Sequence, residues 1–233
     1  MSLLVPPRRP APEILDDPEL PADEMERSLR DLALVNRRWG GSGALARLLV
    51  RRLEERGGRR ARLLDVGAGS GDVSRRLAAR LHRAGFEATV VGVDLQWRHL
   101  AAGRRMSAAR LPAAAADGFR LPFESGAFDW TVSTLVFHHF SPEENVRFLR
   151  ELARVSRDGF AILDLRRHVL PLFFVALAGR LLFQSPVSVR DGVVSVRQAY
   201  TPEEAREIAA RAVEGSRVRK VFPFRLMISR EAA

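Results

Sequence analysis

Leu63-Leu64-Asp65-Val66-Gly67-Ala68-Gly69-Ser70-Gly71-Asp72 is the stretch that decides the fold of this chain. An apolar run enters a glycine-rich turn, and apolar residues at helical spacing follow it, so the stretch predicts a strand, a loop and a helix. Glycines at alternate positions let the backbone approach a ligand closely, and the start of a helix presents free N–H groups. The stretch therefore predicts a nucleotide-binding turn.

The spacing of the glycines indicates which nucleotide binds. A dinucleotide fingerprint has the pattern G-x-G-x-x-G, whereas the three glycines here alternate. Asp65 stands directly before the turn, where a carboxylate would repel a pyrophosphate but could pair with an ammonium group. Asp94 ends the next apolar run, at the place of a ribose diol, and Asp117 follows a third run. Three carboxylates at successive strand ends favour a cationic adenosine compound without phosphate.

Further motifs follow in order, and with them the chain resembles the class I S-adenosylmethionine (SAM)-dependent methyltransferases from about residue 36 onward. The matching segments are residues 64–71, 91–94, 116–118 with 121–123, and 128–129 with 138–139. The segments 121–123 and 128–129 are most similar to the ubiquinone/menaquinone-biosynthesis type and its small-molecule relatives. The resemblance implies an α/β, Rossmann-like, doubly wound fold with a mostly parallel seven-stranded sheet, an N-terminal helical cover and a hydrophobic insertion after the fifth strand.

The resemblance also implies SAM as the cofactor, released as S-adenosylhomocysteine (SAH), and a set of binding residues. The methionine part would be held by Asp65, Gly67, Ala68 and Gly69, with Ser133 and Thr134 beneath it. The ribose and adenine would be held by Asp94, Leu95, Asp117, Gly118 and Phe119. Arg38 or Arg37 would bind the SAM carboxylate, although two ordinary surface arginines explain this pair equally well.

Two adjacent histidines lie just past the expected fourth strand. His138 and His139 fall at the carboxyl edge, where doubly wound sheets place their sites. Either one is a candidate general base for an acceptor that is not already nucleophilic, and Asp164 and His168 are further candidates. A structural role in the wall of the site is the alternative for the histidines. No metal ligand set is expected.

The chain divides into an arm and helical cover, residues 1–57, and the methyltransferase domain, residues 58–233. The first 23 residues are rich in proline and acids and predict an irregular arm. Helices are expected at 24–35, 43–55 and 96–109, strands at 111–116, 128–137 and 160–165, and a terminal hairpin at 217–221 and 224–228. Ser-Pro-Glu-Glu from residue 141 and Thr-Pro-Glu-Glu from residue 201 predict two capped helix starts.

An apolar segment, residues 169–183, lies inside the insertion 167–200. Its apolar side chains fall on both sides of a helix, so another surface must cover it. The segment is too short to span a bilayer, which leaves a lid or substrate pocket, the core, a dimer contact or a membrane surface. The pocket alternative predicts that Phe173, Phe174 and His168 contact the acceptor.

Composition limits the function further. The chain of 233 residues has no cysteine, which excludes disulfides, thiolate metal sites, a cysteine nucleophile and an iron–sulfur cluster, and a cytoplasmic location is expected. The net charge of +10 raises the question of nucleic acid, but the arginine pairs are scattered and aromatic residues do not interleave with them, so nucleic acid is the weaker alternative.

The absence of certain sequence motifs limits which classes of acceptor are expected. The position after the fourth strand lacks the Asn/Asp-Pro-Pro-Tyr/Phe motif of adenine and amide methylation, and methylation of cytosine C5 needs a cysteine. The expected function is methyl transfer to carbon or oxygen of a small apolar or aromatic acceptor, such as a quinol, phenol, polyketide or hydroxy acid. An RNA or protein methyltransferase and a non-catalytic SAM-binding partner remain alternatives. A peripheral membrane contact, and a monomer or a homodimer, all stay open.

Overall fold

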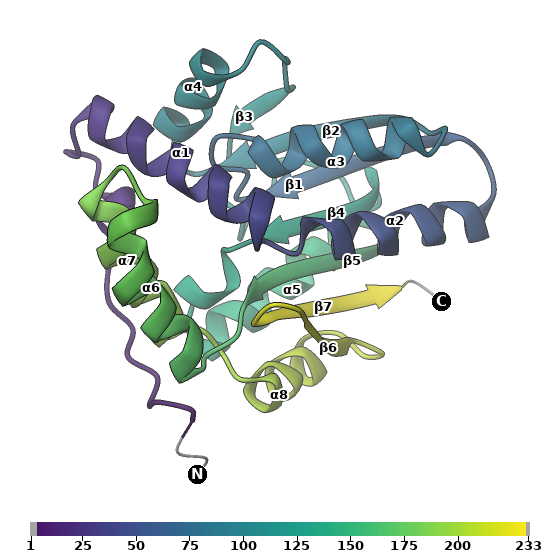
Figure 1. Cartoon of the computed structure of the whole chain (residues 1–233). Helices are drawn as coiled ribbons and strands as arrows, with labels where there is room; N and C mark the ends of the chain where they lie inside the picture. The colour runs from purple at the N-terminus through teal and green to yellow at the C-terminus, as the bar shows by residue number, and fades with distance from the viewer. Residues whose placement is uncertain (1–3, 232–233) are drawn as a thin grey trace.

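The computed structural model describes residues 4–231, except the side chain of Ala178. Its seven-stranded sheet has the order β3-β2-β1-β4-β5-β7-β6, and only β7 runs antiparallel to its neighbours (Figure 1). The strands are β1 (Arg60–Val66), β2 (Glu87–Asp94), β3 (Ala113–Ala115), β4 (Phe128–Thr134), β5 (Ser156–Leu165), β6 (Arg217–Val221) and β7 (Arg225–Glu231). This is the predicted Rossmann-like, doubly wound architecture.

Helices cover both faces of the sheet because consecutive residues of its central strands point to opposite sides. Leu63 of β1 packs with α2 (Ser42–Arg56) and α3 (Asp72–Arg83), while Leu64 packs with α5 (Pro142–Val155) and α8 (Pro202–Ala212). α4 (Trp97–Met106) lies beside β3. The two apolar clusters hold the sheet rigid, so the carboxyl ends of β1 to β5 meet at one edge.

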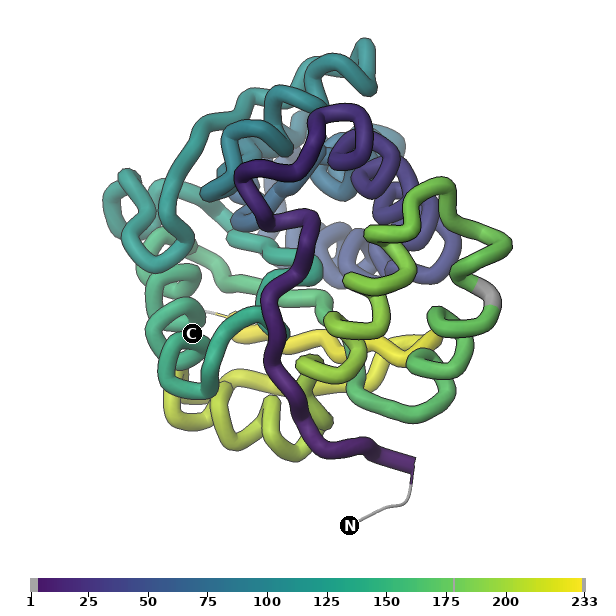
Figure 2. Tube along the Cα trace, turned by 90° about the vertical axis from the view of Figure 1, so that its left-hand side faces the viewer, coloured from purple at the N-terminus to yellow at the C-terminus, as the bar shows by residue number. Residues whose placement is uncertain are grey.

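That edge is covered by elements from both ends of the chain. α1 (Ala22–Arg38), α6 (Val169–Leu182) and α7 (Pro186–Gln198) surround it (Figure 1). Residues 4–20, which we name the N-terminal strap, cross it from α7 toward α4 and contain one turn of 3-10 helix, Ile14–Asp16 (Figure 2). Within residues 4–231, no helix has the length and apolar content needed to cross a membrane.

Both predicted capping boxes are present. The Ser141 hydroxyl accepts from the Glu144 N–H, and the Glu144 carboxylate accepts from the Ser141 N–H. Thr201 and Glu204 repeat the arrangement at the start of α8. The expected ends of several other elements were wrong by a few residues.

The clearest difference concerns β4, which ends at Thr134 instead of continuing to residue 137. Leu135 adopts a positive φ of 61°, which turns the chain out of the sheet into a 3-10 turn, Phe137–His139. β3 is also only three residues long, and α1 continues to Arg38 rather than ending at residue 35. α7, inside the insertion, was not predicted as a separate helix.

Candidate active site

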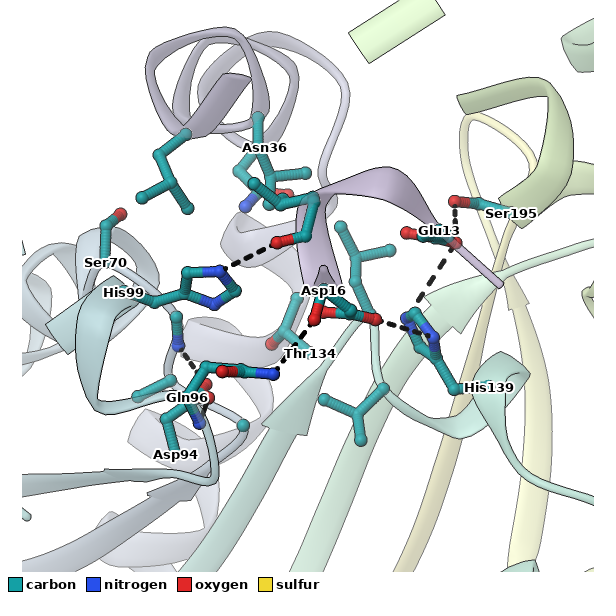
Figure 3. A pocket seen from close by; sticks show the side chains of 18 of the residues that line it. Glu13, Asp16, Asn36, Ser70, Asp94, Gln96, His99, Thr134, His139 and Ser195 are labelled. Carbon is teal, nitrogen blue, oxygen red and sulfur yellow. Dashed lines mark hydrogen bonds and ion pairs between the residues drawn. The ribbon is translucent and has the colours of Figure 1, made fainter. Parts of the chain in front are cut away.

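A cavity of about 450 Å³ opens at the carboxyl edge of the sheet, between the glycine turn after β1, α1, α7 and the strap (Figure 3). One end is lined by the turn and the acids that follow the strands. The other end is lined by apolar side chains of α1, α6 and α7 together with the histidine pair. A volume of several hundred cubic ångströms is typical of small-molecule sites.

The glycine turn is shaped to receive a ligand. Gly67 and Gly69 have positive φ values of 76° and 54°. A Cβ at Gly67 would meet a Val136 methyl at 2.2 Å, so only glycine fits there, whereas a Cβ at Gly69 would meet nothing within 4 Å. Gly69 therefore presents bare backbone to open space, as a close ligand requires.

The three acids are held in place by backbone N–H groups or a hydroxyl. Asp94 accepts from the N–H groups of Gly69 and Gln96 at 2.7 and 2.8 Å. Asp117 accepts from the Phe119 N–H at 2.9 Å. Asp65 accepts from the Ser74 hydroxyl through Oδ2, while its Oδ1 has no hydrogen-bond partner among the described residues. Burial, helped by the charge of Asp94, raises the pKa of Asp65 to about 6 despite the bond from Ser74.

Buried polar atoms without a hydrogen-bond partner indicate whether the cavity is suited to a polar ligand such as SAM. Nine buried side-chain atoms of the described residues lack a hydrogen-bond partner, and five of them belong to residues that line this cavity. These are Asn36 Oδ1, Asp65 Oδ1, Thr134 Oγ1, His138 Nε2 and Arg225 Nη1, of which His138 Nε2 has an ion-pair partner in Glu13. Native proteins pair almost all buried polar groups, so such a concentration marks the place of a polar ligand. The acids and the bare glycine backbone suit a cationic adenosine compound.

His138 is buried between two carboxylates. Its Nδ1 lies 2.7 Å from Asp164 Oδ1, and its Nε2 lies 3.4 Å from Glu13 Oε1. Burial opposes a charged imidazole, but the fields of Asp164 and Glu13 outweigh it and raise the pKa of His138 to about 10. The same pairing lowers the pKa of Asp164 and of Glu13, although burial opposes ionisation of both. His138 is therefore an imidazolium at neutral pH.

His139 has the opposite character. Burial and the positive charge of His138 lower its pKa below 6.5, so the ring is neutral at neutral pH. Its nitrogens face Glu13 and Asp16 of the strap at 3.9 and 3.6 Å (Figure 3). Ligand atoms of Glu13, His138 and His139 lie within 4.8 Å of one another. The ion pair of His138 with Glu13 contributes to bringing these side chains together.

The strap closes the cavity through polar contacts at three points. The Arg8 guanidinium donates to the carbonyls of His138, Phe140 and Gln198. The carboxylate of Asp191 on α7 accepts from the Ile14 and Leu15 N–H groups at 2.9 and 2.8 Å. On the far side, Arg98 of α4 donates to the carbonyls of Pro18 and Leu20.

Most of the predicted cofactor residues meet at the cavity. Those that line it are Asp65, Gly67, Ala68, Gly69, Asp94, Leu95, Asp117, Gly118, Phe119 and Thr134, together with His138 and His139. Asp164 is not part of the lining and acts on the cavity through His138. The structure thus gathers residues from four strand ends, as parallel strands do.

Ser133 and Arg38 do not reach the cavity. Ser133 is fully buried, and its hydroxyl donates to the Val66 carbonyl at 2.7 Å, so it ties β4 to β1. Arg38 is exposed at the end of α1, and Asn36 of the same helix lines the cavity instead. The predicted helix ended too early, and the extra turn rotates Arg38 away.

The predicted acceptor residues are also misplaced. Phe173 and Phe174 are 67% and 43% exposed and do not line the cavity, whereas Val175 and Phe183 do. α6 packs on α7 with the other side of its apolar surface, so the side that carries Phe173 and Phe174 faces outward. His168 caps α6, because its Nδ1 accepts from the Leu170 N–H, and it is not part of the cavity lining.

Sequence reasoning missed the residues that come from distant parts of the chain. Glu13 and Asp16 of the strap, Ser195 of α7 and Arg225 of β7 all line the cavity. The Ser195 hydroxyl donates to Glu13 Oε1 at 2.5 Å across 182 positions of sequence. No local motif marks these residues. The only signal was a glutamate between prolines and apolar residues in an arm rich in acids.

Comparison with known proteins finds a family match within this chain. Residues 63–159 match the family described as a methyltransferase domain. A curated relative, 2-phytyl-1,4-naphtoquinone methyltransferase from Nostoc punctiforme, is 35% identical over 111 residues, which cover 45% of this chain and 46% of the relative. The aligned region thus spans about half the length of that relative.

Solved structures share the fold at low sequence identity. A SAM-dependent methyltransferase from Aquifex aeolicus has a TM-score of 0.59 at 18% identity and covers 89% of this chain and 97% of its own. The magnesium protoporphyrin IX methyltransferase from Synechocystis PCC 6803, with bound SAH, has a TM-score of 0.53 at 17% identity, covering 83% and 84%. The plantazolicin methyltransferase has a TM-score of 0.60 at 16% identity, covering 83% and 70%.

The matched domain and the fold agree with each other. Residues 63–159 match a methyltransferase domain, and the described chain shares the fold of solved SAM-dependent methyltransferases.

Proposed function

We propose that this protein transfers the methyl group of SAM to an oxygen or carbon of a small, largely apolar acceptor. The observation that carries the proposal is the two-ended cavity. Its acidic, glycine-lined end lies at β1 and β2, and its apolar end lies at α1, α6 and α7. The 2-phytyl-1,4-naphtoquinone methyltransferase, whose name states an apolar acceptor, supports the choice of a small molecule.

The cofactor end would be held by residues of three strand ends. SAM, when bound, supplies a methyl group on a sulfonium centre, which needs no further activation. Asp65 Oδ1 has a free acceptor position for the ammonium of the methionine part. Asp94 and Asp117 would bind the ribose and adenine through the carboxylate positions that their backbone contacts leave open. Holding the two reactants in fixed positions can lower the activation free energy of a transfer reaction by roughly 7–11 kcal/mol.

The two histidines would have different roles. His139 is neutral and lines the cavity, so it can accept a proton from an acceptor hydroxyl. His138 is already protonated at neutral pH and cannot serve as a base there. Its imidazolium instead holds Glu13 of the strap beside the cavity and so helps to exclude water.

Calorimetric titration with SAH tests the cofactor half of the proposal. Asp94→Ala should weaken SAH binding about tenfold to hundredfold, because hydrogen bonds to a charged group are worth about 1.5–3 kcal/mol. Glu87→Ala is the matched control, because Glu87 lies at the opposite end of the same strand with its side chain 72% exposed.

Methyl transfer tests the acceptor half. Labelled SAM and a panel of hydroquinones, phenols and hydroxy acids should yield methylated products, and His139→Gln should slow the reaction for acceptors that must lose a proton. The proposal fails if the wild type does not bind SAH, or if RNA or protein is methylated and no member of the panel is.

A further inference from the structure

Arg225, the first residue of β7, is a buried cation that the fold leaves incompletely paired. It is 4% exposed, lines the cavity and lies opposite Leu165 in the antiparallel β5–β7 pair. Its Nε donates to the Trp39 carbonyl at 3.4 Å, and its Nη1 has no hydrogen-bond partner. No carboxylate among residues 4–231 forms an ion pair with it.

Arg167, another buried arginine, is a useful comparison because all three of its guanidinium nitrogens are hydrogen-bonded. Arg167 is 5% exposed, and its three nitrogens donate to the Pro6 carbonyl, the Ala199 carbonyl and the Glu204 carboxylate. Because an unpaired buried charge is costly, such saturation is the usual arrangement. Arg225 departs from it at a position that faces a cavity.

Asp164 is a carboxylate whose charge acts on Arg225, but its oxygens already accept other hydrogen bonds. Its Oδ1 accepts from His138 Nδ1 and from the Leu165 N–H, and its Oδ2 accepts from the His138 N–H at 3.3 Å. Burial lowers the pKa of Arg225 to about 10, and the field of Asp164 opposes that fall. The guanidinium therefore stays positively charged at neutral pH while its Nη1 lacks an acceptor.

The position of Arg225 in the sheet separates it from the cofactor end. The order β1-β4-β5-β7 puts three strand spacings between the glycine turn and Arg225, about 14 Å at the usual separation of strands (Figure 1). Val175, Phe183 and Val196 line the cavity together with Arg225. This half of the cavity thus combines apolar walls with two buried cations, of which the His138 imidazolium is paired with Asp164 and Glu13 and Arg225 is not paired with a carboxylate of the described residues.

We propose that Arg225 binds an anionic oxygen of the acceptor, so that the substrate class is an apolar or aromatic carboxylic acid or its phenolate counterpart. The inference rests on the proposed function and specifies its acceptor. A guanidinium matches the two oxygens of a carboxylate, and a charged pair is stronger away from water. The same contact would hold the acceptor in one orientation across the cavity.

Two probes of equal shape test this proposal without any substitution. 2-Naphthoic acid and 2-naphthamide differ in charge but not in ring system. Calorimetry on the wild type with saturating SAH should show the acid binding about tenfold to hundredfold more tightly than the amide. Nitrophenols, which ionise near neutral pH where Arg225 stays charged, form a second arm when compared above and below their own pKa, and this arm distinguishes a phenolate from a carboxylate as the source of the anion.

Substitutions of Arg225 then test whether this residue causes the tighter binding of the acid. Arg225→Gln should remove the preference for the acid and leave the affinity for the amide nearly unchanged, and Arg225→Lys should retain part of it. Melting curves check that both variants fold. SAH and 5′-methylthioadenosine, which lacks the amino acid carboxylate, should bind Arg225→Gln as they bind the wild type.

Two results would overturn the assignment. One is equal affinity of the wild type for the acid and the amide, including no binding of either at millimolar concentration. The other is a large loss of SAH affinity in Arg225→Gln with unchanged binding of 5′-methylthioadenosine, because Arg225 would then hold the cofactor carboxylate. Failure of the wild type to bind SAH is a different result and refutes the proposed function itself.

Discussion

Glu13 of the strap and His138 of the turn after β4 face each other inside the cavity, with 3.4 Å between Glu13 Oε1 and His138 Nε2. The other ring nitrogen of His138 lies 2.7 Å from Asp164 on β5. One imidazolium thus joins a strap residue to the centre of the sheet. Since the strap also covers the cavity, we expect the protonated form of His138 to help hold the strap in place.

Glu13→Gln should loosen the strap. The amide oxygen can still accept from Ser195 and Gln198, as the carboxylate does, but it no longer attracts the His138 imidazolium. We expect the free energy of unfolding to fall by about 1–3 kcal/mol, the usual cost of a buried charge that loses its partner. Urea denaturation measures the loss, and limited proteolysis shows whether the strap is cut sooner. Glu19→Gln, an exposed change in the same strap, should have no effect.

The stability of the protein should fall at alkaline pH through His138. The pKa of His138 rises from 6.5 in the unfolded chain to about 10 in the folded protein. Its contribution to the free energy of unfolding is therefore fully present below about pH 6.5. That contribution is then lost as the pH rises toward about 10. Denaturation series over this window should show the decline in the wild type and a flatter profile for His138→Gln. His82→Gln, an exposed change on α3, should keep the wild-type slope.

The sequence predicted the parts of the site that local motifs encode. The glycine turn, the acids at the strand ends and the histidines after β4 all follow short apolar runs, so their positions depend on strand spacing alone. Ser133 and Arg38 were assigned wrongly because their orientation depends on where an element ends, and a shift of one residue in a strand or helix turns a side chain away.

The residues that close the cavity could not be predicted in the same way. Glu13 reaches Ser195 across 182 positions, and Arg225 reaches Trp39 across 186. Such contacts depend on the packing of the strap, α7 and β7, and none of these elements carries a motif. The apolar segment 169–183 shows the same limit, because its composition predicted a covered helix but not which side the cavity would use.

SAH affinity should depend on pH through Asp65. Its pKa is about 6 in the free protein, and pairing with a ligand ammonium requires the carboxylate form. SAH binding should therefore weaken as the pH falls through about 6, and Asp65→Asn should bind weakly at every pH with little pH dependence. Titration calorimetry between about pH 5 and pH 8 measures both profiles. Unchanged affinity of the wild type across this range would remove Asp65 from the ammonium site.

Two phenylalanines of the apolar segment provide a matched pair for the acceptor half of the cavity. Phe183 lines the cavity, whereas Phe173 is 67% exposed on the outer side of α6. Phe183→Ala should weaken acceptor binding by up to about tenfold to hundredfold, because burying such a side chain against an apolar ligand is worth about 1.5–3 kcal/mol. Phe173→Ala should leave both acceptor turnover and the melting temperature nearly unchanged. SAH affinity should stay constant in both variants, since the cofactor end lies at β1 and β2.

Turnover assays and melting curves on the same preparations separate loss of contact from loss of folding. A drop in turnover for Phe173→Ala, with Phe183→Ala unaffected, would place the acceptor on the outer side of α6 and contradict the cavity as its site.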